Sequence, residues 1–360
     1  MSIHFHSLLI SDIRRETNDC ISVAFDIPDV LKDTFSFREG QNITLRITIN
    51  GEELRRSYSI CSSPVENELR VAIKAVMDGR FSVYANQTLK KGDRIDALPP
   101  TGKFHIHLDS LHKKQYVAFA AGSGITPIIS IIKTVLATEP LSEFTLVYGN
   151  RNRTSIIFRE DLEALKNKYM NRFRVIHILS REITDAPINY GRITADKCEQ
   201  LGTALINWNN TDHFFLCGPE EMIFTVRDFL LLHGVESTNI HFELFTTPGQ
   251  KVSEREKSIN ATKELGPVAS VTVKLDGIAF QFDLPYHGSS ILDAALKQGA
   301  DLPYACKGGV CSTCKAKLVL GKVDMDQNYA LEPDEIAAGY ILTCQSHPRN
   351  PELVVDYDMR

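Results

Sequence analysis

The residues most able to do chemistry are four cysteines near the C-terminal end of the chain. Cys306, Cys311 and Cys314 form a C-x4-C-x2-C run, and Cys344 follows from a more distant segment. Thiolates with this spacing can converge on a small metal centre, and the pattern is typical of a [2Fe–2S] cluster. Structural zinc is the alternative, although zinc sites ordinarily use two C-x2-C pairs and this segment has one. The spacing therefore favours an iron–sulfur centre.

The other four of the eight cysteines are scattered, at Cys20, Cys61, Cys198 and Cys217. A disulfide framework would spread its cysteines through a secreted chain, whereas a cluster at one end indicates metal binding in a reducing compartment. The N-terminus lacks the basic start, apolar core and cleavage site of a signal peptide, so we expect a cytoplasmic protein, in which Cys20, Cys61 and Cys198 are packing residues.

A second group of chemically useful residues lies on a strand expected at residues 55–60. Arg56, Tyr58 and Ser59 are near neighbours there. An arginine pairs with phosphate, an aromatic face packs on a flat ring, and a small hydroxyl can hydrogen-bond a ring nitrogen. These residue types suit a flavin nucleotide, and an ordinary half-buried strand is the alternative.

The next motif opens a short helix expected at residues 81–89. It contains Gly79, Phe81 and Ser82. Backbone N–H groups at a helix start, helped by the Ser82 hydroxyl, can hold a pyrophosphate. A plain turn with a capping residue is the alternative. The motif supports a flavin site because it follows the strand that carries Arg56, Tyr58 and Ser59.

A glycine-containing loop separates an apolar strand from an amphipathic helix. Gly122, Gly124, Thr126 and Pro127 give it the form G-x-G-x-x-P, in which proline replaces the third glycine of the dinucleotide fingerprint. Proline is tolerated near a helix start, because its missing N–H would have no partner there. The loop suits the pyrophosphate of a nicotinamide dinucleotide, with a tight strand–helix turn as the alternative.

Two arginines follow the next expected strand, about where the adenosine ribose of such a dinucleotide should lie. They are Arg151 and Arg153. Arginine at this place suits a 2′-phosphate, which favours NADPH over NADH. Exposed loop charge is the alternative.

The secondary-structure elements that must position these residues show three different sequence patterns along the chain. The first hundred residues contain short β runs separated by turns, which indicates a small antiparallel barrel. From about residue 115, apolar strands alternate with longer helical stretches, which indicates a parallel sheet covered by helices. Residues 246–268 are poor in apolar side chains and are expected to form a linker. The expected strands lie at 20–27, 42–49, 55–60, 69–76 and 93–98 in the first part and at 116–120, 144–148, 174–179 and 213–217 in the second.

Composition narrows the class of protein. The chain has 360 residues, of which 43% are hydrophobic and 24% charged, and a net charge of -5. These values are typical of a folded globular protein. The absence of a basic excess argues against nucleic acid or an anionic membrane as a partner. No apolar run approaches the roughly 20 residues that a membrane-spanning helix needs.

In chain order, these motifs resemble the ferredoxin–NADP reductase superfamily joined to a C-terminal plant-type [2Fe–2S] ferredoxin domain. Cys217, Gly218 and Pro219 add the C-G-P motif of that superfamily. The resemblance implies a multidomain fold with an antiparallel β-barrel that binds FAD, an α/β parallel-sheet nicotinamide domain and an α+β β-grasp ferredoxin domain. The corresponding ranges are 1–110, 111–245 and 269–360, with the linker at 246–268.

The resemblance also implies roles for single residues. The cluster ligands would be Cys306, Cys311, Cys314 and Cys344. Cys217 would position the nicotinamide toward the flavin, and Phe245, where the reductase part ends, would cover the flavin or pack in the core. No residue is expected to act as an acid or base, because the cofactors carry the chemistry.

The order of the domains is similar to that of the reductase components of multicomponent bacterial oxygenases. It implies an oxidoreductase that passes electrons from NAD(P)H to FAD, to a [2Fe–2S] cluster and on to an oxygenase. Residues 328–347 resemble the reductases of diiron phenylacetyl-CoA epoxidases, with the reductases of Rieske-type 3-ketosteroid 9α-hydroxylases as the alternative. A flavin and iron–sulfur redox sensor is an alternative of another class, although a sensor would not need flavin and nicotinamide sites in tandem.

Overall fold

The computed structural model describes residues 4–245 and 267–359. The chain divides into two compact units, which we describe separately. Residues 6–54 and 58–245 form the larger unit, and the smaller one contains the C-terminal residues. The linker expected at 246–268 lies almost entirely outside the described residues. None of the helices within the described ranges is long and apolar enough to cross a membrane.

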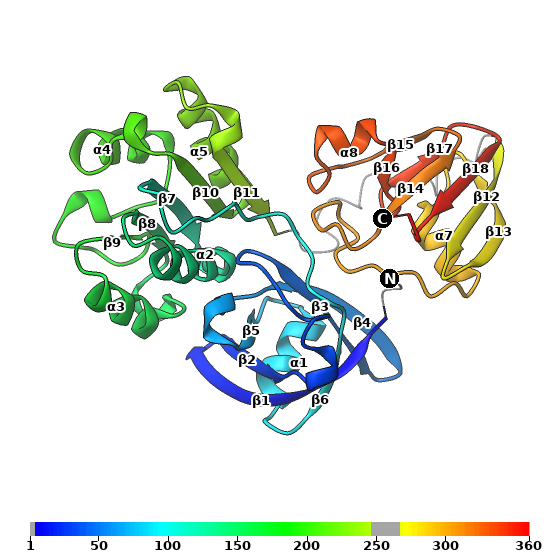
Figure 1. The fold of residues 1–360 in the computed structure, drawn as a ribbon, viewed down its shortest axis with the longest axis horizontal. Coiled ribbons are helices and arrows are strands. Elements are labelled where there is room, and N and C mark those ends of the chain that lie inside the picture. The colour runs from blue at the N-terminus through cyan, green and yellow to red at the C-terminus, as the bar shows by residue number, and fades with distance from the viewer. Residues whose placement is uncertain (1–3, 246–266, 360) are drawn as a thin grey trace. The chain divides into compact units, whose positions relative to one another are not determined.

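The larger unit begins with a six-stranded antiparallel sheet in the order β4-β3-β6-β1-β2-β5 (Figure 1). An antiparallel bridge between Ile60 and Val71 links the two ends of this order, because Ile60 directly follows β4 and Val71 lies in β5. The sheet therefore closes on itself as the expected barrel. The elements are β1 (His6–Thr17), β2 (Cys20–Asp26), β3 (Asn42–Ile49), β4 (Glu52–Ser59), β5 (Leu69–Lys74), α1 (Arg80–Thr88) and β6 (Arg94–Ala97).

Alternate residues of the strands fill the barrel interior. Ile21, Val23 and Phe25 of β2 point inward together, as the two-residue period of a strand requires. Burying each such side chain stabilises the fold by about 1.5–3 kcal/mol. β1 was not predicted from the sequence, because Leu8 and Ile10 are its only fully buried apolar residues and polar residues dominate the rest of its length.

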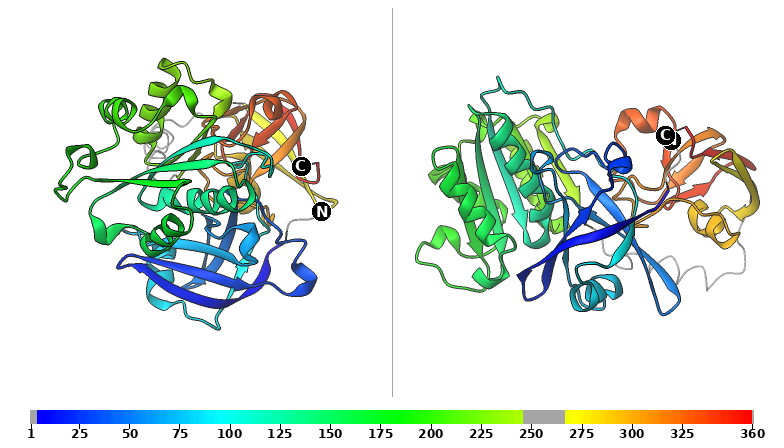
Figure 2. Two further views of the ribbon diagram at one scale, coloured as in Figure 1. Left: turned by 60° about the vertical axis from the view of Figure 1, so that its left-hand side comes forward. Right: turned by 60° about the horizontal axis from the view of Figure 1, so that its bottom comes forward.

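The second part of the larger unit is a five-stranded parallel sheet in the order β11-β10-β7-β8-β9. Helices α2 and α3 lie on one face and α4 and α5 on the other, as Figures 1 and 2 show. The strands are β7 (Gln115–Ala121), β8 (Glu143–Asn150), β9 (Phe173–Leu179), β10 (His213–Gly218) and β11 (Ile240–Leu244). The helices are α2 (Ile125–Thr138), α3 (Arg159–Lys168), α4 (Ala195–Ala204) and α5 (Glu220–Leu232).

Aromatic residues cover both faces of this sheet. Phe215 packs near Tyr116 on the face of α2, whereas its neighbour Phe214 packs against Trp208 on the opposite face. A strand buried on both faces reads as a continuous apolar run, which is the pattern the sequence showed. The barrel interior is an apolar cluster of its own, whereas Cys20 and Phe104 belong to the cluster of α2 and the parallel strands, so one side of the barrel packs against the parallel-sheet part.

The smaller unit is a mixed sheet in the order β13-β12-β18-β14-β16, with a separate pair β15-β17. β12 and β18 are parallel, and the other strand pairings among the described residues of this unit are antiparallel. The hairpin turn at Asp276 and Gly277 has two positive φ angles, as a tight two-residue turn requires. The elements are β12 (Val268–Leu275), β13 (Ile278–Pro285), α7 (Ile291–Lys297), β14 (Lys315–Leu320), β15 (Val323–Met325), α8 (Pro333–Ala337), β16 (Tyr340–Leu342), β17 (Ser346–Pro348) and β18 (Glu352–Asp356).

Candidate cofactor-binding sites

The parallel sheet reverses its strand order between β7 and β10, and two of the sequence motifs meet there. Residues 122–124 form a short 3-10 turn directly after β7, and Gly218 ends β10. In open α/β sheets, ligands bind beyond the carboxyl ends of the strands at such a switch point. The structure therefore brings together the two motifs that the sequence analysis assigned to a nicotinamide dinucleotide.

Gly124 lets the glycine loop lie directly against β10. A Cβ atom at this residue would lie 2.1 Å from the carbonyl oxygen of Cys217, which is closer than atoms can pack. Gly122 has φ +55°, a conformation that favours glycine. Its carbonyl accepts a hydrogen bond of 3.0 Å from the Tyr148 hydroxyl. The backbone of the loop is thus held from two strands.

Thr126 and Pro127 lie in the first turn of α2. The Thr126 hydroxyl donates to the carbonyl of Ser123 at 3.0 Å, which closes the turn between the glycines and the helix. Both residues are buried. Their buried side chains pack inside the domain and support the loop. The groups that the loop presents to a ligand are therefore backbone N–H groups at a helix start.

Cys217 lies beside a residue that the sequence analysis did not single out. In the parallel register of β10 and β11, Cys217 is the partner of Glu243. The Ser59 hydroxyl donates to a Glu243 carboxylate oxygen at 3.0 Å. This contact joins the flavin motif on β4 to the nicotinamide motif on β10. Burial raises the pKa of the Cys217 thiol well above its usual value, so this thiol is not an activated nucleophile.

Glu243 is a partly buried acid whose pKa is shifted to near neutral pH. Burial raises its pKa to about 7, against the lowering effect of hydrogen bonds from Ser59 and Asn42. The signal available in the sequence was an acidic residue between Phe242 and Leu244 on a strand. A charged residue in an apolar strand is unusual enough to indicate a functional position.

Arg56 and Tyr58 lie on β4 as expected. The rings of Tyr58 and Phe81 pack with centroids 5.5 Å apart. Phe81 is 1% exposed, so its side chain backs Tyr58 from the barrel core and offers a ligand only its backbone. The Arg56 guanidinium donates to the carbonyl of Arg55 at 2.6 Å. Phosphate binding by Arg56 and ring packing by Tyr58 stay predictions.

The loop before α1 depends on glycine. A Cβ at Gly79 would lie 2.4 Å from Cγ2 of Val76 and 2.5 Å from Oγ of Ser82. The Ser82 hydroxyl accepts from the N–H of Val76 at 3.2 Å and donates to the carbonyl of Gly79 at 3.1 Å. The hydroxyl therefore already closes its own loop, and its expected contact with pyrophosphate stays a prediction.

The two arginines after β8 differ in their surroundings. Arg153 pairs with Glu182, through its side-chain Nε at 3.2 Å and its backbone N–H at 2.8 Å. Arg181 follows the neighbouring strand β9 and donates its backbone N–H to the carbonyl of Arg151 at 2.8 Å. Arg181 and Glu182 were not predicted from the sequence, although the carboxyl ends of parallel strands meet at one edge of the sheet.

The remaining residues of the larger unit behave as follows. Phe245 follows β11 and is 42% exposed, and its contact with a flavin stays a prediction. Cys20, Cys61 and Cys198 are almost completely buried, which confirms that they are packing residues. Burial raises the pKa of Cys20 and of Cys198 to about 12.

In the smaller unit, the four candidate ligands lie in two pairs. The Sγ atoms of Cys306 and Cys311 are 3.2 Å apart, and the thiol of Cys314 is hydrogen-bonded to Cys344. Among the described residues, no three or more His, Cys, Asp or Glu side chains are grouped so as to hold a single metal ion. Two pairs of thiols do fit a [2Fe–2S] cluster, in which four ligands are divided between two irons.

In the loop that carries three of these cysteines, hydrogen bonds to a neighbouring cysteine together with burial raise the pKa of Cys311 and of Cys314, whereas the pKa of Cys306 is lowered. A hydrogen bond from the Cys311 thiol and backbone N–H groups, including that of Gly308, lower the pKa of Cys306 to about 6. The Gly308 N–H lies 3.3 Å from the Cys306 sulfur. Gly309 has φ +74°, and a Cβ there would lie 2.7 Å from the carbonyl of Gln327. Deprotonated sulfur and converging N–H groups are what an iron–sulfur cluster requires.

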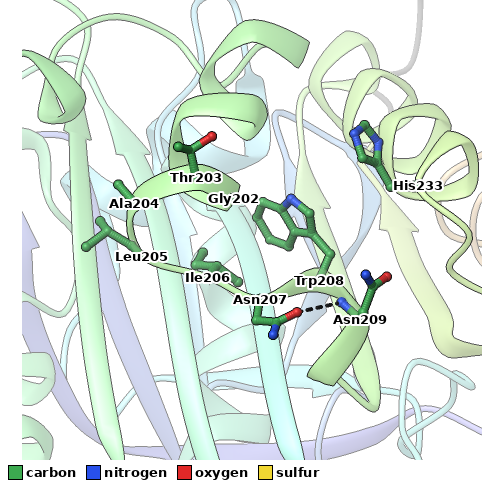
Figure 3. Close-up of a pocket in the computed structure, with 9 residues that line it drawn as sticks. All are labelled: Gly202, Thr203, Ala204, Leu205, Ile206, Asn207, Trp208, Asn209 and His233. Carbon is green, nitrogen blue, oxygen red and sulfur yellow. Dashed lines mark hydrogen bonds between the residues drawn. The ribbon is translucent and has the colours of Figure 1, made fainter.

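A cavity of about 480 Å³ lies away from all of these motifs. Figure 3 shows the indole of Trp208 beside Gly202, with His233 across the cavity. These residues precede β10 or follow α5, so the cavity is at the edge of the sheet opposite the glycine loop. No candidate residue of the sequence analysis lines it.

Three family models match the chain in the order that the motifs predict. An oxidoreductase FAD-binding domain matches residues 7–106, and an oxidoreductase NAD-binding domain matches residues 119–228. A 2Fe-2S iron-sulfur cluster binding domain matches residues 273–349. The barrel, the parallel sheet and the smaller unit are thus a FAD-binding, an NAD-binding and a [2Fe–2S] domain.

Two curated relatives span nearly the whole chain. The chain is 45% identical to a 1,2-phenylacetyl-CoA epoxidase subunit of Escherichia coli (strain K12), over 99% of this chain and 98% of the relative. It is 33% identical to the ferredoxin reductase component of a 3-ketosteroid-9-alpha-monooxygenase of Rhodococcus rhodochrous, over 97% of this chain and 96% of the relative. Both relatives belong to oxygenase systems.

A solved structure shows the same fold. Phthalate dioxygenase reductase, described as a modular structure for electron transfer from pyridine nucleotides to [2Fe–2S], matches with a TM-score of 0.58. The match covers 98% of this chain and 98% of that chain, at 24% sequence identity. The likeness establishes the three-domain reductase fold.

Proposed function

Because the chain belongs to the family of oxygenase reductase components that combine FAD-binding, NAD-binding and [2Fe–2S] domains, we propose that it supplies electrons to a phenylacetyl-CoA epoxidase. The supporting observation is the 45% identity to a subunit of such an epoxidase over 99% of this chain, against 33% for the steroid monooxygenase reductase. The chain is an NAD(P)H-dependent oxidoreductase with either partner. The proposed oxygenase is the diiron enzyme expected from the sequence.

The chain's own residues would bind and orient the two nucleotides. The glycine loop before α2 would hold the pyrophosphate of the nicotinamide dinucleotide through its backbone N–H groups. Cys217, Gly218 and Pro219 would bring the nicotinamide end toward Ser59. FAD, when bound, accepts two electrons from the nicotinamide and releases them singly.

On the barrel, the proposed flavin contacts come from β4 and the start of α1. Arg56 would pair with the flavin phosphate and Tyr58 would pack on the ring, backed by the buried Phe81. The Gly79 loop would offer backbone N–H groups to the pyrophosphate. Ser59 would place its hydroxyl near the reactive ring nitrogen, in a position fixed by its hydrogen bond to Glu243.

In the [2Fe–2S] domain, we propose the four paired cysteines as the cluster ligands. The pair Cys306 and Cys311 would hold one iron, and Cys314 and Cys344 would hold the other. The thiols are all less than 10% exposed, which keeps bulk water from the sulfurs. The cluster, when bound, carries one electron at a low potential suited to an oxygenase acceptor.

We also propose NADPH as the preferred donor. Arg151 and Arg181 lie at neighbouring strand ends, where a 2′-phosphate would meet two guanidinium groups. Arg153 contributes less in this proposal, because Glu182 already pairs with it.

A cytoplasmic location is part of the same proposal. All eight cysteines are free in the structure, and each of them is buried. A protein with free thiols and an iron–sulfur site suits a reducing compartment.

Reconstitution with purified oxygenases tests the choice of partner. NADPH consumption should become dependent on phenylacetyl-CoA when the chain is mixed with a phenylacetyl-CoA epoxidase oxygenase component. The oxygenase component of 3-ketosteroid 9α-hydroxylase, with its steroid, is the matched comparison. Faster and better coupled turnover with the steroid oxygenase would overturn the proposal in favour of a Rieske partner.

A further inference from the structure

The side chain of Gln345, directly after the fourth candidate ligand, contacts both parts of the iron–sulfur site. Its Nε2 atom donates to the carbonyl of Lys307 at 2.8 Å and to the carbonyl of Cys344 at 3.1 Å. The same nitrogen lies 3.7 Å from the Cys344 sulfur, and because an amide nitrogen carries only two hydrogens, one N–H is shared between the carbonyl and the sulfur of Cys344. One amide thus reaches the three-cysteine loop and a sulfur of the remote segment.

The backbone and neighbours of Gln345 fix this position. Its N–H donates to the carbonyl of Leu342 at 2.9 Å, and its carbonyl accepts from the N–H of Asp326 at 2.9 Å. A Cβ at Gly309 would lie 3.2 Å from Cγ of Gln345, so the glycine leaves the space that the glutamine stem occupies. The side chain is therefore packed between the two segments.

The loop residue that accepts this hydrogen bond is in an unfavourable conformation. Lys307 has φ +53°, a left-handed conformation that is unfavourable for a residue with a side chain. Such a conformation persists only when surrounding contacts hold it. The hydrogen bond from Gln345 to the Lys307 carbonyl is one of these contacts, and the Lys307 ammonium pairs with Asp293 at 2.6 Å as another.

An N–H group directed at a cluster sulfur changes the energy of the two oxidation states unequally. Reduction adds negative charge to the sulfurs, and the positive end of the N–H dipole stabilises that charge. Hydrogen bonds to the sulfurs are among the factors that set the potential of iron–sulfur clusters. Removing such a donor makes the cluster harder to reduce.

We propose that Gln345 is a positioning residue that fastens the three-cysteine loop to the segment of Cys344 and raises the reduction potential of the cluster through its N–H···S contact. This inference rests on the proposed ligand set and adds a residue to it that is not a ligand. It gives the glutamine a role in deciding how readily the flavin reduces the cluster.

The test is a redox titration of the full-length holoprotein, followed by the EPR signal of the reduced cluster. At the solution potential where half of the wild-type cluster is reduced, Gln345→Leu should lower the ratio of reduced to oxidised cluster about threefold or more. Gln345→Glu keeps the shape but replaces the donor with a carboxylate. It should lower that ratio about tenfold, which corresponds to 59 mV for a one-electron couple.

Thr343→Val is the matched control. The Thr343 hydroxyl donates to the carbonyl of Cys314 at 3.0 Å, so it also ties the two segments together, but through a backbone oxygen. Its loss should leave the midpoint potential within the error of wild type. Gln345 variants with a full cluster and an unchanged midpoint would overturn the proposal, as would a Thr343→Val shift as large as theirs.

The outcomes of cluster assembly separate this inference from the ligand assignment. If Gln345→Leu loses the cluster but Gln345→Glu retains it, the midpoint potential of Gln345→Glu tests the proposal: a lowered midpoint supports it and an unchanged one overturns it. Loss of the cluster from both variants, with a native far-UV spectrum, would replace the tuning role by an assembly role and overturn the proposal. A wild-type protein that binds no [2Fe–2S] cluster would instead overturn the ligand assignment itself.

Discussion

The Ser59 hydroxyl donates a hydrogen bond to the Glu243 carboxylate, with 3.0 Å between the two oxygens. Ser59 ends β4 of the FAD-binding barrel, and Glu243 lies on β11 of the NAD-binding sheet. Glu243 is also the register partner of Cys217, which carries the nicotinamide motif. One partly buried acid therefore links the two places where the flavin and the nicotinamide are expected to meet.

The first prediction concerns Glu243 and pH. Its pKa is raised from 4.5 to about 7 in the folded protein. Between these values the folded state keeps a proton that the unfolded state has lost, so the free energy of unfolding falls as pH rises. Above pH ~7, ionised Glu243 lowers the free energy of unfolding by the full amount that corresponds to this pKa shift, about 3 kcal/mol. A neutral glutamine side chain at this position removes that cost, so Glu243→Gln should raise the melting temperature by several degrees at pH 8 and little at pH 4.5.

Release of FAD fluorescence on heating measures this transition in the full-length protein. Glu163→Gln, at an exposed position of α3, is the matched control and should show no such pH-dependent difference. A Glu243→Gln melting curve that follows wild type at both pH values would contradict the assignment of a raised pKa.

The second prediction distinguishes two reasons for glycine in the nucleotide loop, namely close packing against β10 at Gly124 and a positive φ angle at Gly122. Gly124→Ala places a methyl group against the Cys217 carbonyl, and the overlap should cost about 3 kcal/mol or more. Gly122→Ala meets no atom within 4 Å and suffers only from its positive φ, at about 1–2 kcal/mol. Binding of a non-reducible NADPH analogue, measured by calorimetry, should be lost in the former and weakened in the latter. Equal effects would contradict the close approach of the loop to β10.

The third prediction concerns the choice between NADPH and NADH. Arg151→Ala and Arg181→Ala should each raise the KM for NADPH about tenfold or more, because each removes a charged hydrogen-bond donor to a phosphate. The KM for NADH should change little. Arg153→Ala serves as the comparison and should have a smaller effect, since Glu182 neutralises that guanidinium. Equal changes for both cofactors would remove the argument for a 2′-phosphate site.

The fourth prediction separates the cluster from the flavin. Cys314→Ser should abolish the [2Fe–2S] absorbance while FAD binding and NADPH-dependent reduction of ferricyanide by the flavin remain. Cys198→Ala changes an equally buried cysteine of the NAD-binding domain and should leave the cluster spectrum intact. Retention of a full cluster by Cys314→Ser would contradict the ligand assignment.

The sequence predicted the barrel and the parallel sheet because their cores repeat at a regular spacing. The runs at 42–49 and 116–120 are apolar on one or both faces, and β3 and β7 lie there. Strand β1 escaped prediction because its two fully buried residues, Leu8 and Ile10, are too few to show a period. Its place is decided by pairing with β2 and β6, which is tertiary information.

The candidate site was predictable only where a motif is local. The glycine loop and the cysteine run are contiguous, so their spacing was visible. Glu243, Arg181 and Gln345 act through segments distant in sequence, namely β4, β8 and the cluster loop. Their partners become apparent only when the strands are placed side by side, although the acid between apolar residues at Glu243 was a local signal.

The most direct measurement is anaerobic rapid mixing of the holoprotein with NADPH, with flavin absorbance and the EPR signal of the cluster followed together. We expect the flavin to bleach first and the cluster then to be reduced at a rate independent of protein concentration, because both centres belong to one chain. A cluster that stays oxidised after full flavin reduction, or is reduced only in proportion to protein concentration, would contradict the account.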